Sequence, residues 1–314
     1  MKILLAGASG AIGQPVLNRL ITSGHQVTAI HRAAAGAERL RASGAIPVQV
    51  DVLDRPALLT ALDGHQYDAM ISELTALKKT PTRHADMALT NRLRIDGTAN
   101  LLAAAEQSGA TRFVSQSMVF GYGYGDFGGR VLTENDQFGP PGHRGFEDHL
   151  AAMRSAEEQV LGSGQVQGIA LRYGLIYGPG PAGDPLVDSL RRRRLPGIKN
   201  GGVLPWVYVD DAADATVAAL DRGAAGAAYN IADDEPVSLS DLMIAIAEAI
   251  GAPRPMVVPT WVLTAMPYAK AVMTGGLRVS NAKARDELGW TPNHPTYREG
   301  VAEFAEHYRR QAAA

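Results

Sequence analysis

The sequence predicts an α/β fold built on a doubly wound parallel sheet, with a smaller α/β part towards the C-terminus. Two observations predict it. Short apolar runs alternate with segments of helical period through the first half of the chain, and a glycine-rich turn joins the first apolar run to the first helix. Alternation at this spacing is typical of parallel strands joined by right-handed helical crossovers, with helices on both faces of the sheet.

The elements of the first half follow from this alternation. The expected strands are Lys2–Ala6, Gln26–His31, Val48–Val50, Asp68–Ser72, Arg112–Gln116 and Gly168–Leu171. The expected helices are Gln14–Ser23, Gly36–Ser43, Asn91–Gln107 and Phe146–Leu161. Each strand is a buried apolar run, and each helix places apolar residues three and four positions apart.

The regular alternation of strands and helices ends after Tyr173, where glycines and prolines at 178–183 indicate a rigid loop. The elements expected beyond it are a short helix ending at Arg191–Arg194, strands Trp206–Val209 and Ala228–Ile231 flanking a helix at Ala212–Leu220, and helices at Ser238–Ile250, Ala282–Leu288 and Arg298–Arg309. We therefore expect a nucleotide-binding domain at 1–175, to which 206–230 returns. Residues 176–205 and 231–314 form the substrate-binding part, over the edge of the sheet where ligands bind in this architecture.

Composition excludes several classes of function. The chain has 314 residues, a formal charge of −2 and no cysteine, which excludes disulfides, thiol nucleophiles and cysteine-ligated metals. Without a positive field, nucleic acid and anionic membranes are not expected partners. The apolar stretch 257–273 is too short and too interrupted by prolines for a membrane span, and no secretory signal is visible. No histidine or acidic spacing fits a metal site. We expect a cytoplasmic protein.

A nucleotide-binding loop follows the first strand directly. The residues GASGAIG at 7–13 place Gly7, Gly10 and Gly13 between a strand and a helix that has Pro15 in its first turn. Glycines there permit a tight turn, close approach to a pyrophosphate and close helix packing, while the helix N-terminus offers free N–H groups. A Gly-Lys-Ser/Thr sequence is absent from this loop, so an ATPase loop is excluded. The pattern predicts a Rossmann-type dinucleotide site.

The end of the second strand indicates which dinucleotide binds. An acidic residue about 20 positions after the loop holds the ribose 2′-hydroxyl of NAD, but no acidic residue occurs between Gly13 and Glu38. The strand ends instead in His31-Arg32, and an arginine there suits a 2′-phosphate. We expect NADP(H) to be preferred, with NAD(H) possible.

Several motifs together resemble the extended short-chain dehydrogenase/reductase superfamily, in its NAD-dependent epimerase/dehydratase-like branch. The resembling segments are the glycine loop, Asp51-Val52, Leu74-Thr75-Ala76, GTANLL at 97–102, SQSMVFG at 115–121, LRY at 171–173 with YGPG at 177–180, VYVDD at 207–211 and LGWTP at 288–292. With the loop and the basic strand end, the resemblance implies cofactor contacts from Gly7, Ser9, Gly10, Ala11, Ile12, Gly13, His31, Arg32, Asp51, Val52, Leu74, Thr75, Ala76, Gln116, Tyr173, Gly174 and Ile176.

The chain departs from this family at its catalytic pair, Tyr-x-x-x-Lys. None of the ten tyrosines has a lysine four residues later, and no lysine lies between Lys79 and Lys199. Aligned on Glu157, His149 stands at the tyrosine position and Met153 at the lysine position. Gln116 stands where the family has a serine or threonine on the fifth strand.

Candidate donors for a developing oxyanion must therefore come from other side chains. We consider Gln116 and Ser117 as an oxyanion pair, Tyr122 as a residue of a flexible lid, and His149 as an acid or base. Each has a structural alternative: strand-end capping for Gln116 and Ser117, loop anchoring for Tyr122, and an ordinary surface histidine for His149.

Three functions remain open from the sequence. The leading hypothesis is an NADPH-dependent reductase of a ketone, aldehyde or enone on a small organic substrate. The alternatives are an epimerase or dehydratase with tightly bound NAD(P), and a non-catalytic regulatory protein that senses NADP(H). The resemblance also implies a possible homodimer through the helices at 91–107 and 146–161.

Overall fold

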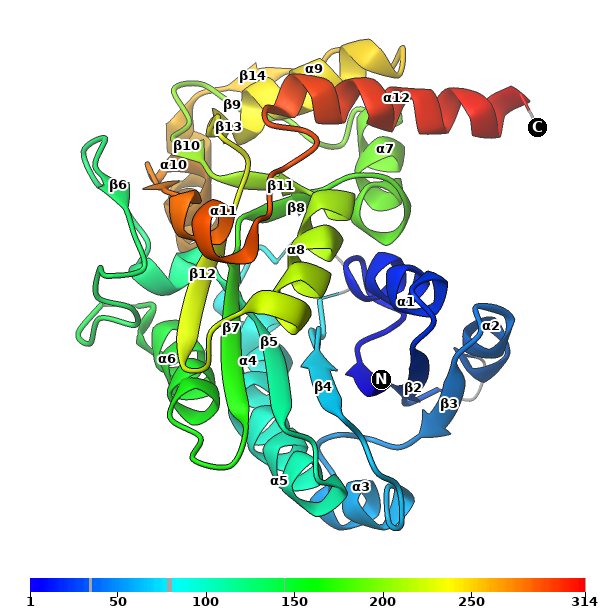
Figure 1. The fold of residues 1–314 in the computed structure, drawn as a ribbon. Helices are drawn as coiled ribbons and strands as arrows, with labels where there is room; N and C mark the ends of the chain where they lie inside the picture. Colours follow the sequence, from blue (N-terminus) through cyan, green and yellow to red (C-terminus); the bar gives the residue numbers. More distant parts are fainter. Residues whose placement is uncertain (34–35, 78–80, 144, 314) are drawn as a thin grey trace.

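The computed structural model describes residues 1–33, 36–77, 81–143 and 145–313, and a seven-stranded parallel sheet forms its centre (Figure 1). The strand order is β12-β7-β5-β4-β1-β2-β3. The strands are β1 (Lys2–Ala6), β2 (Gln26–His31), β3 (Ile46–Gln49), β4 (Ala69–Ser72), β5 (Arg112–Met118), β7 (Gln167–Tyr173) and β12 (Ala227–Ile231). The chain reverses direction across the sheet between β1 and β4, and such a switch point is where ligands bind in α/β sheets.

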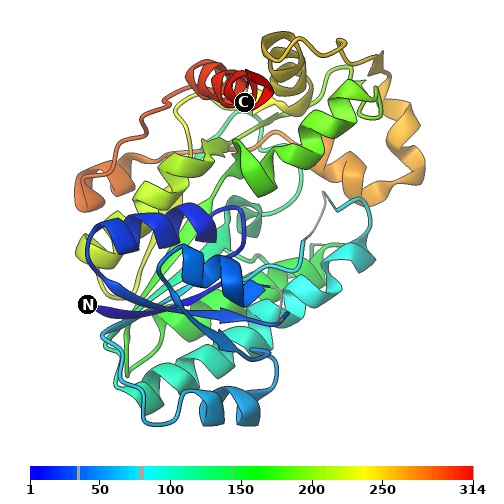
Figure 2. The ribbon, with the colours of Figure 1, turned by 90° about the vertical axis from the view of Figure 1, so that its right-hand side faces the viewer.

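Both faces of this sheet are covered, as the predicted fold class requires (Figures 1 and 2). On one face, Ile3 and Leu5 pack with α1 (Gly13–Thr22), α8 (Val209–Arg222) and α11 (Ala282–Leu288). On the other face, Leu4 and Ala6 pack with α3 (Arg55–Ala61), α5 (Thr98–Ser108) and α6 (Glu147–Leu161). Successive residues of β1 therefore enter opposite cores, which explains its unbroken apolar sequence.

The predicted helix at Asn91–Gln107 is the largest departure in the first half. The structure has a 3₁₀ turn at His84–Met87, α4 at Ala88–Arg92, a π turn at Leu93–Gly97 and then α5. Prediction of one uninterrupted helix was wrong, because apolar periodicity does not separate an i→i+4 from an i→i+5 hydrogen-bond pattern. π turns are rare and occur frequently at functional sites.

The C-terminal part lies at the end of the sheet where the strands point (Figure 1). It contains α7 (Asp184–Arg191), α9 (Leu239–Ala249), α10 (Pro267–Thr274) and α12 (Tyr297–Ala313), with a 3₁₀ turn at Thr260–Ala265. Four two-stranded sheets join its loops: β8 (Leu175–Tyr177) with β11 (Trp206–Tyr208), β10 (Val203–Leu204) with β13 (Val237–Ser238), β9 (Gly197–Ile198) with β14 (Val257–Val258), and β6 (Val131–Leu132) with β15 (Arg278–Val279).

Segment 206–230, expected to return to the first domain, divides between two sheets. α8 packs on α1 and most of β12 continues the main sheet beside β7, whereas β11 pairs with β8 outside it. Ser238 caps α9, since its hydroxyl accepts a hydrogen bond from the N–H of Asp241 at 3.1 Å. Helix α3 was missed, although Asp54 caps it and Pro56 stands in its first turn.

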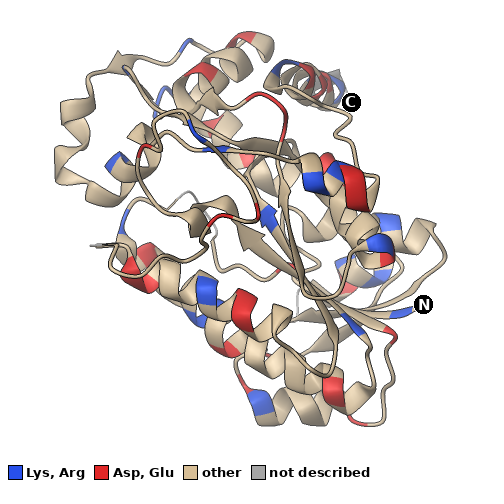
Figure 3. Ribbon diagram, turned by 60° about the vertical axis from the view of Figure 1, so that its left-hand side comes forward, with Lys and Arg blue, Asp and Glu red and all other residues tan. Residues whose placement is uncertain are grey.

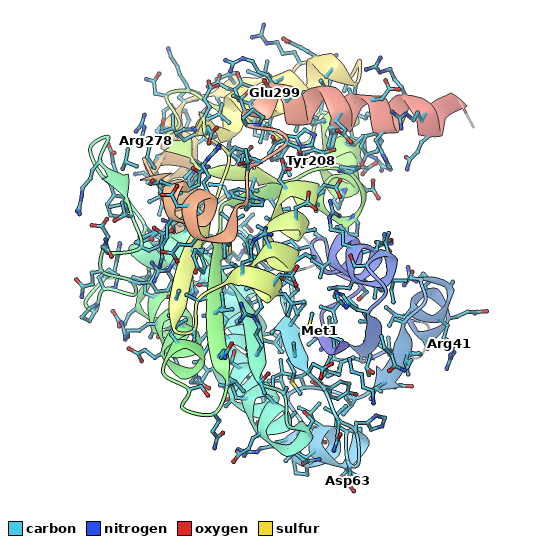
Figure 4. The ribbon with its side chains drawn as sticks, in the orientation of Figure 1. Met1, Arg41, Asp63, Tyr208, Arg278 and Glu299 are labelled. Atoms are coloured by element: carbon cyan, nitrogen blue, oxygen red, sulfur yellow. The ribbon has the colours of Figure 1, made fainter. Side chains whose placement is uncertain are left out.

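A cluster of charged side chains ties the C-terminal helix to the main fold. His294 contacts Asp211 of α8 and Glu303 of α12, each at 2.8 Å. Burial by itself lowers the pKa of His294, but the two carboxylates outweigh burial and raise the pKa to about 9. The imidazole lies against the ring of Tyr208, with the ring centres 4.1 Å apart; Figure 4 labels Tyr208 between α8 and α12. Residues distant in sequence thereby fix the C-terminal part over the sheet.

The described surface carries charges of both signs. Figure 3 shows lysines and arginines interspersed with aspartates and glutamates along the helices of one side. Among the residues that the structure describes, no helix is long and apolar enough to cross a membrane.

Candidate active site

A cleft opens at the switch point between β1 and β4, beside the glycine loop. Its lining residues are Gly7, Ser9, Gly10, Ile30, His31, Arg32, Ala33, Gly36, Arg39, Val50, Asp51, Val52, Glu73, Leu74, Thr75 and Leu93. They come from the ends of β1, β2, β3 and β4 and from the loops and helices that follow these strands. Nine of these sixteen residues are among the cofactor contacts expected from the sequence, and cofactor contact stays a prediction for them.

The glycine loop has the shape that a dinucleotide needs. The N–H of Gly10 donates to the carbonyl of Gly7 at 2.8 Å, which closes the turn. A Cβ on Gly13 would lie 2.0 Å from the oxygen of Gly7, and one on Gly7 would lie 2.4 Å from the oxygen of Glu73. Gly7 also has a φ of +93°, which favours glycine. The loop can therefore pack against helix α1 and leave its N–H groups open to a diphosphate.

We expect Gly13→Ala to abolish NADPH binding. The added methyl group collides with backbone, which cannot move aside as a flexible side chain would. Titration of the purified protein with NADPH measures the change in affinity. Gly164→Ala is the matched control, because a Cβ there meets nothing within 4 Å. Unchanged NADPH affinity in Gly13→Ala would contradict the assignment of the loop.

Two arginines stand where the adenosine ribose of a dinucleotide would lie. Arg32 follows β2, and Arg39 lies on α2 (Ala37–Ala42), with both side chains exposed to the cleft. The sequence prediction named His31 and Arg32 and missed Arg39. No sequence motif pointed to Arg39, which reaches the cleft from the short helix after β2. Two guanidinium groups suit a phosphate better than a hydroxyl.

Some predicted cofactor residues do not line the described cleft. Ala11, Ile12, Gly13, Ala76, Gln116, Tyr173, Gly174 and Ile176 are outside the set given above. Gly13 acts through the turn, and Gln116 contacts the cleft indirectly, because its side-chain amide donates to the carbonyl of Leu74 at 2.9 Å. These assignments to cofactor contact stay predictions.

Tyr173 bonds to the buried carboxyl group of Glu73, a residue that the sequence did not single out. Its hydroxyl donates to Glu73 at 3.0 Å and lies 2.6 Å from the hydroxyl of Thr216. The second oxygen of Glu73 is buried without a hydrogen-bond partner. Burial raises the pKa of Glu73 to about 8, with the bond from Tyr173 opposing the shift. The carboxyl group therefore remains neutral at pH 7, beside the cleft.

Glu73 should make the protein less stable as pH rises. Its folded-state pKa lies above the usual 4.5, so folding favours the protonated form. Its contribution is complete below about pH 4.5 and is lost as pH rises through 8. We expect the free energy of unfolding to fall between about pH 4.5 and 8 by up to about 1.4 kcal/mol per pH unit for this group.

Denaturant unfolding of wild type and Glu73→Gln across that pH range measures the difference. The variant should show a shallower fall. The free energy of unfolding of the variant should still fall with pH, because burial also raises the pKa of Asp233 to about 8. If the free energy of unfolding changes with pH in the same way in both proteins, the raised pKa does not belong to Glu73.

Ser117 and Tyr122, two of the proposed catalytic residues, lie in a buried network. Ser117 donates to Glu157 of α6 at 2.6 Å, and Arg172 of β7 pairs with the same carboxylate at 2.7 Å. Arg172 also donates to the hydroxyl of Tyr122, which donates in turn to Asn230 of β12. Both residues are almost completely buried. This arrangement favours the structural interpretation of Ser117 and Tyr122, and their catalytic roles stay untested.

His149 is buried, so its interpretation as a surface histidine was wrong. Its side chain is 3% exposed, because the first turn of α6 is covered by the 3₁₀ turn that holds His84. Asn91 donates to its Nδ1 at 2.8 Å, and its Nε2 lies 2.9 Å from Nδ1 of His84. Burial, together with His84 and Arg94, lowers the pKa of His149 to about 4. His149 is therefore a neutral imidazole at pH 7, unsuited to act as a strong acid.

The fold and the cleft define a dinucleotide-binding protein of the short-chain dehydrogenase/reductase type, with an altered catalytic position. Residues 3–232 match the model of the NAD dependent epimerase/dehydratase family. The chain belongs to this family and is an NAD(P)-dependent enzyme of the oxidoreductase type.

Curated relatives include two reductases. The chain is 34% identical to a 3-diazoavenalumate denitrifying reductase of Streptomyces, over 96% of this chain and 99% of that protein. It is 29% identical to a 2-alkyl-3-oxoalkanoate reductase of Stenotrophomonas maltophilia, over 81% and 77%. Among solved structures, the UDP-glucose 4-epimerase of Thermotoga maritima has the same fold, with a TM-score of 0.80, 22% identity and coverage of 99% and 100%.

Proposed function

We propose that the protein is an NADPH-dependent reductase that acts on a polarised unsaturated group of a small organic molecule. The observation that carries this proposal is the cleft itself: a glycine loop shaped for a diphosphate, with Arg32 and Arg39 at its ribose end. When bound, NADPH supplies the hydride. The chain's own residues hold the cofactor and the substrate, and they exclude water from the reacting group.

Two acceptor groups fit this proposal, and they differ in their need for a proton. Reduction of a carbonyl compound to an alcohol consumes one hydride and one proton. This acceptor agrees with the relative named an oxoalkanoate reductase. A neutral His149 with its low pKa offers no strong acid for that proton, and its Nε2 is already engaged with Nδ1 of His84 at 2.9 Å.

Reductive removal of nitrogen from an aromatic diazonium group needs no acid. The group C–N₂⁺ and one hydride give C–H and N₂, with charge and atoms balanced and no net proton taken up. The relative named a denitrifying reductase of a diazo compound agrees with this acceptor. The neutral His149 at the position of the family's acid favours it over the carbonyl.

The experiment follows NADPH oxidation at 340 nm with two sets of substrates. One set is a panel of ketones, aldehydes and enones; the other is an ortho-diazophenol, with release of N₂ measured in parallel. We expect one NADPH consumed per N₂ released. Turnover of carbonyl compounds alone would assign the carbonyl acceptor instead. Turnover of a nucleotide sugar without net NADPH oxidation would favour an epimerase and contradict the proposal.

Two further expectations from the sequence remain proposals for this chain. They are the preference for NADPH over NADH and the homodimer. The expected dimer helix at 91–107 exposes Ile95, at 40%. Size-exclusion chromatography with light scattering measures the oligomeric state.

A further inference from the structure

Arg94 lies in the π turn that interrupts the long helix, at the border of the cleft. The preceding residue, Leu93, lines the cleft. Thr90, one helical turn earlier, accepts a hydrogen bond at 3.3 Å from the N–H of Ala76, in the loop that leaves β4. Arg94 directly follows Leu93 in the π turn and so stands beside this part of the cleft.

Arg94 is a buried cation without an acidic partner among the described residues. Its side chain is 9% exposed and makes one hydrogen bond, a long one of 3.4 Å to the side-chain oxygen of Asn91. Arg172 is similarly buried but is bonded three times to the carboxylate of Glu157. A guanidinium has five N–H donors, and burying it without a partner is costly. A buried guanidinium with free donors is a site that an anion would stabilise.

The described surroundings of Arg94 include the hydroxyls of Tyr124 and Tyr268, which bond to each other, while Asp86 acts on Tyr268 from the 3₁₀ turn. Burial raises the pKa of both Tyr124 and Tyr268, so both hydroxyls stay protonated. Asn91 accepts from Arg94 and donates to His149, which fixes the direction of this hydrogen-bond chain towards His84. Arg94 therefore keeps N–H donors that no described residue accepts, and these donors would bind a negatively charged group.

This place lies between the two parts of the molecule. Tyr268 belongs to α10 of the C-terminal part, whereas Arg94 and His149 belong to the sheet's own helices. The rings of Tyr124 and Phe146 stack with their centres 4.1 Å apart, and Tyr268 stacks on Phe146 at 5.9 Å. Flat aromatic walls beside a cation suit a planar, unsaturated acid.

We propose that Arg94 binds the carboxylate of the substrate and that the enzyme acts on planar, unsaturated organic acids. The proposal rests on the reductase function proposed above, and it names the class of molecule that the same site takes. The carboxylate would fill the free donors of Arg94, with the tyrosine hydroxyls beside it, and so place the reducible group towards the cleft.

Ligand binding to protein saturated with NADP⁺ tests the proposal. The probes are benzoate and 4-hydroxycinnamate, each compared with its uncharged methyl ester by isothermal titration calorimetry. We expect the acids to bind and the esters to bind at least about tenfold more weakly. Arg94→Met should weaken binding of the acids by roughly 10- to 100-fold, as expected for lost hydrogen bonds to a charged group.

Thermal unfolding of the same variants separates binding from a structural role. Arg94→Met keeps an apolar stem and removes an unpaired buried charge, so Tm should stay equal or rise. Arg92→Met is the matched control on the same helix: Arg92 is exposed and pairs at the surface with Asp96. It should leave both binding and Tm unchanged. Arg94→Lys should recover part of the affinity for the acids.

The remaining outcomes overturn the proposal. They are equal binding of acids and esters, a lower Tm of Arg94→Met with unchanged acid binding, or no binding of either acid at 10 mM. Weaker binding of NADPH alone in Arg94→Met would assign Arg94 to the cofactor instead. Failure of wild-type protein to bind NADPH, seen in the same titrations, would refute the reductase function separately.

Discussion

Arg32→Ala should weaken NADPH binding by roughly 10- to 100-fold and leave NADH binding nearly unchanged. The physical reason is the loss of charge-assisted hydrogen bonds, each set worth about 1.5–3 kcal/mol, to a phosphate that NADH lacks. Arg39 lines the same part of the cleft, so the double variant Arg32→Ala/Arg39→Ala should lose the preference for NADPH altogether. Fluorescence titration of each protein with both cofactors measures the two dissociation constants.

Arg41→Ala is the control for a general charge effect. Arg41 lies on the same helix as Arg39, is exposed and is outside the set that lines the cleft (Figure 4). Its replacement should leave the NADPH preference within about twofold, because exposed charges beyond the contact shell are screened. If Arg32→Ala weakens NADPH and NADH equally, the two arginines do not read the 2′-phosphate, and the NADP assignment fails.

Glu157→Gln should destabilise the protein by about 3–5 kcal/mol, because it leaves the buried guanidinium of Arg172 without its counter-charge. The pair is 2.7 Å apart, with side chains 6% and 5% exposed. Ser117 and Tyr122 bond to the two members, so the network joins β5, α6, β7 and β12. Urea unfolding followed by circular dichroism measures the free energy of unfolding.

The surface pair Arg92–Asp96 provides the comparison. Its side chains are 60% and 52% exposed, so Asp96→Asn should change stability by less than about 1 kcal/mol. Ser117→Ala distinguishes the two interpretations of that residue. We expect a moderate loss of stability with turnover retained; lost turnover at unchanged stability would show instead that Ser117 is catalytic.

The strands and the glycine loop were predictable because their causes are local in the chain. β1 and β2 have the predicted bounds, since an apolar run between turn residues fixes a buried strand. Helix bounds were right to within a few residues at α1 and α6. The π turn at Leu93–Gly97 was not predictable, because its hydrogen-bond pattern depends on packing against α6 and the loop after β4.

Some residues of the candidate site could likewise be predicted from local sequence, and others could not. Gly7, Gly13 and Arg32 could be named from spacing alone, because the turn, the helix and the strand end are neighbours in sequence. Arg39 and Glu73 needed the structure, which brings a helix and a strand end to one cleft. The roles considered for Ser117 and His149 could not be weighed from sequence, since burial is a tertiary property.

The sequence by itself determined the fold class, the dinucleotide loop, the basic end of β2 and the absence of Tyr-x-x-x-Lys. These features depend on residue type and on spacing along the chain. Tertiary structure alone decided that Tyr122 bonds to Asn230, 108 residues away, and that Ser117 bonds to Glu157, 40 residues away. It also decided that Arg94 is buried without a carboxylate among the described residues. A side chain's energy depends on the partners that folding brings to it, and the parallel sheet brings them from distant parts of the chain.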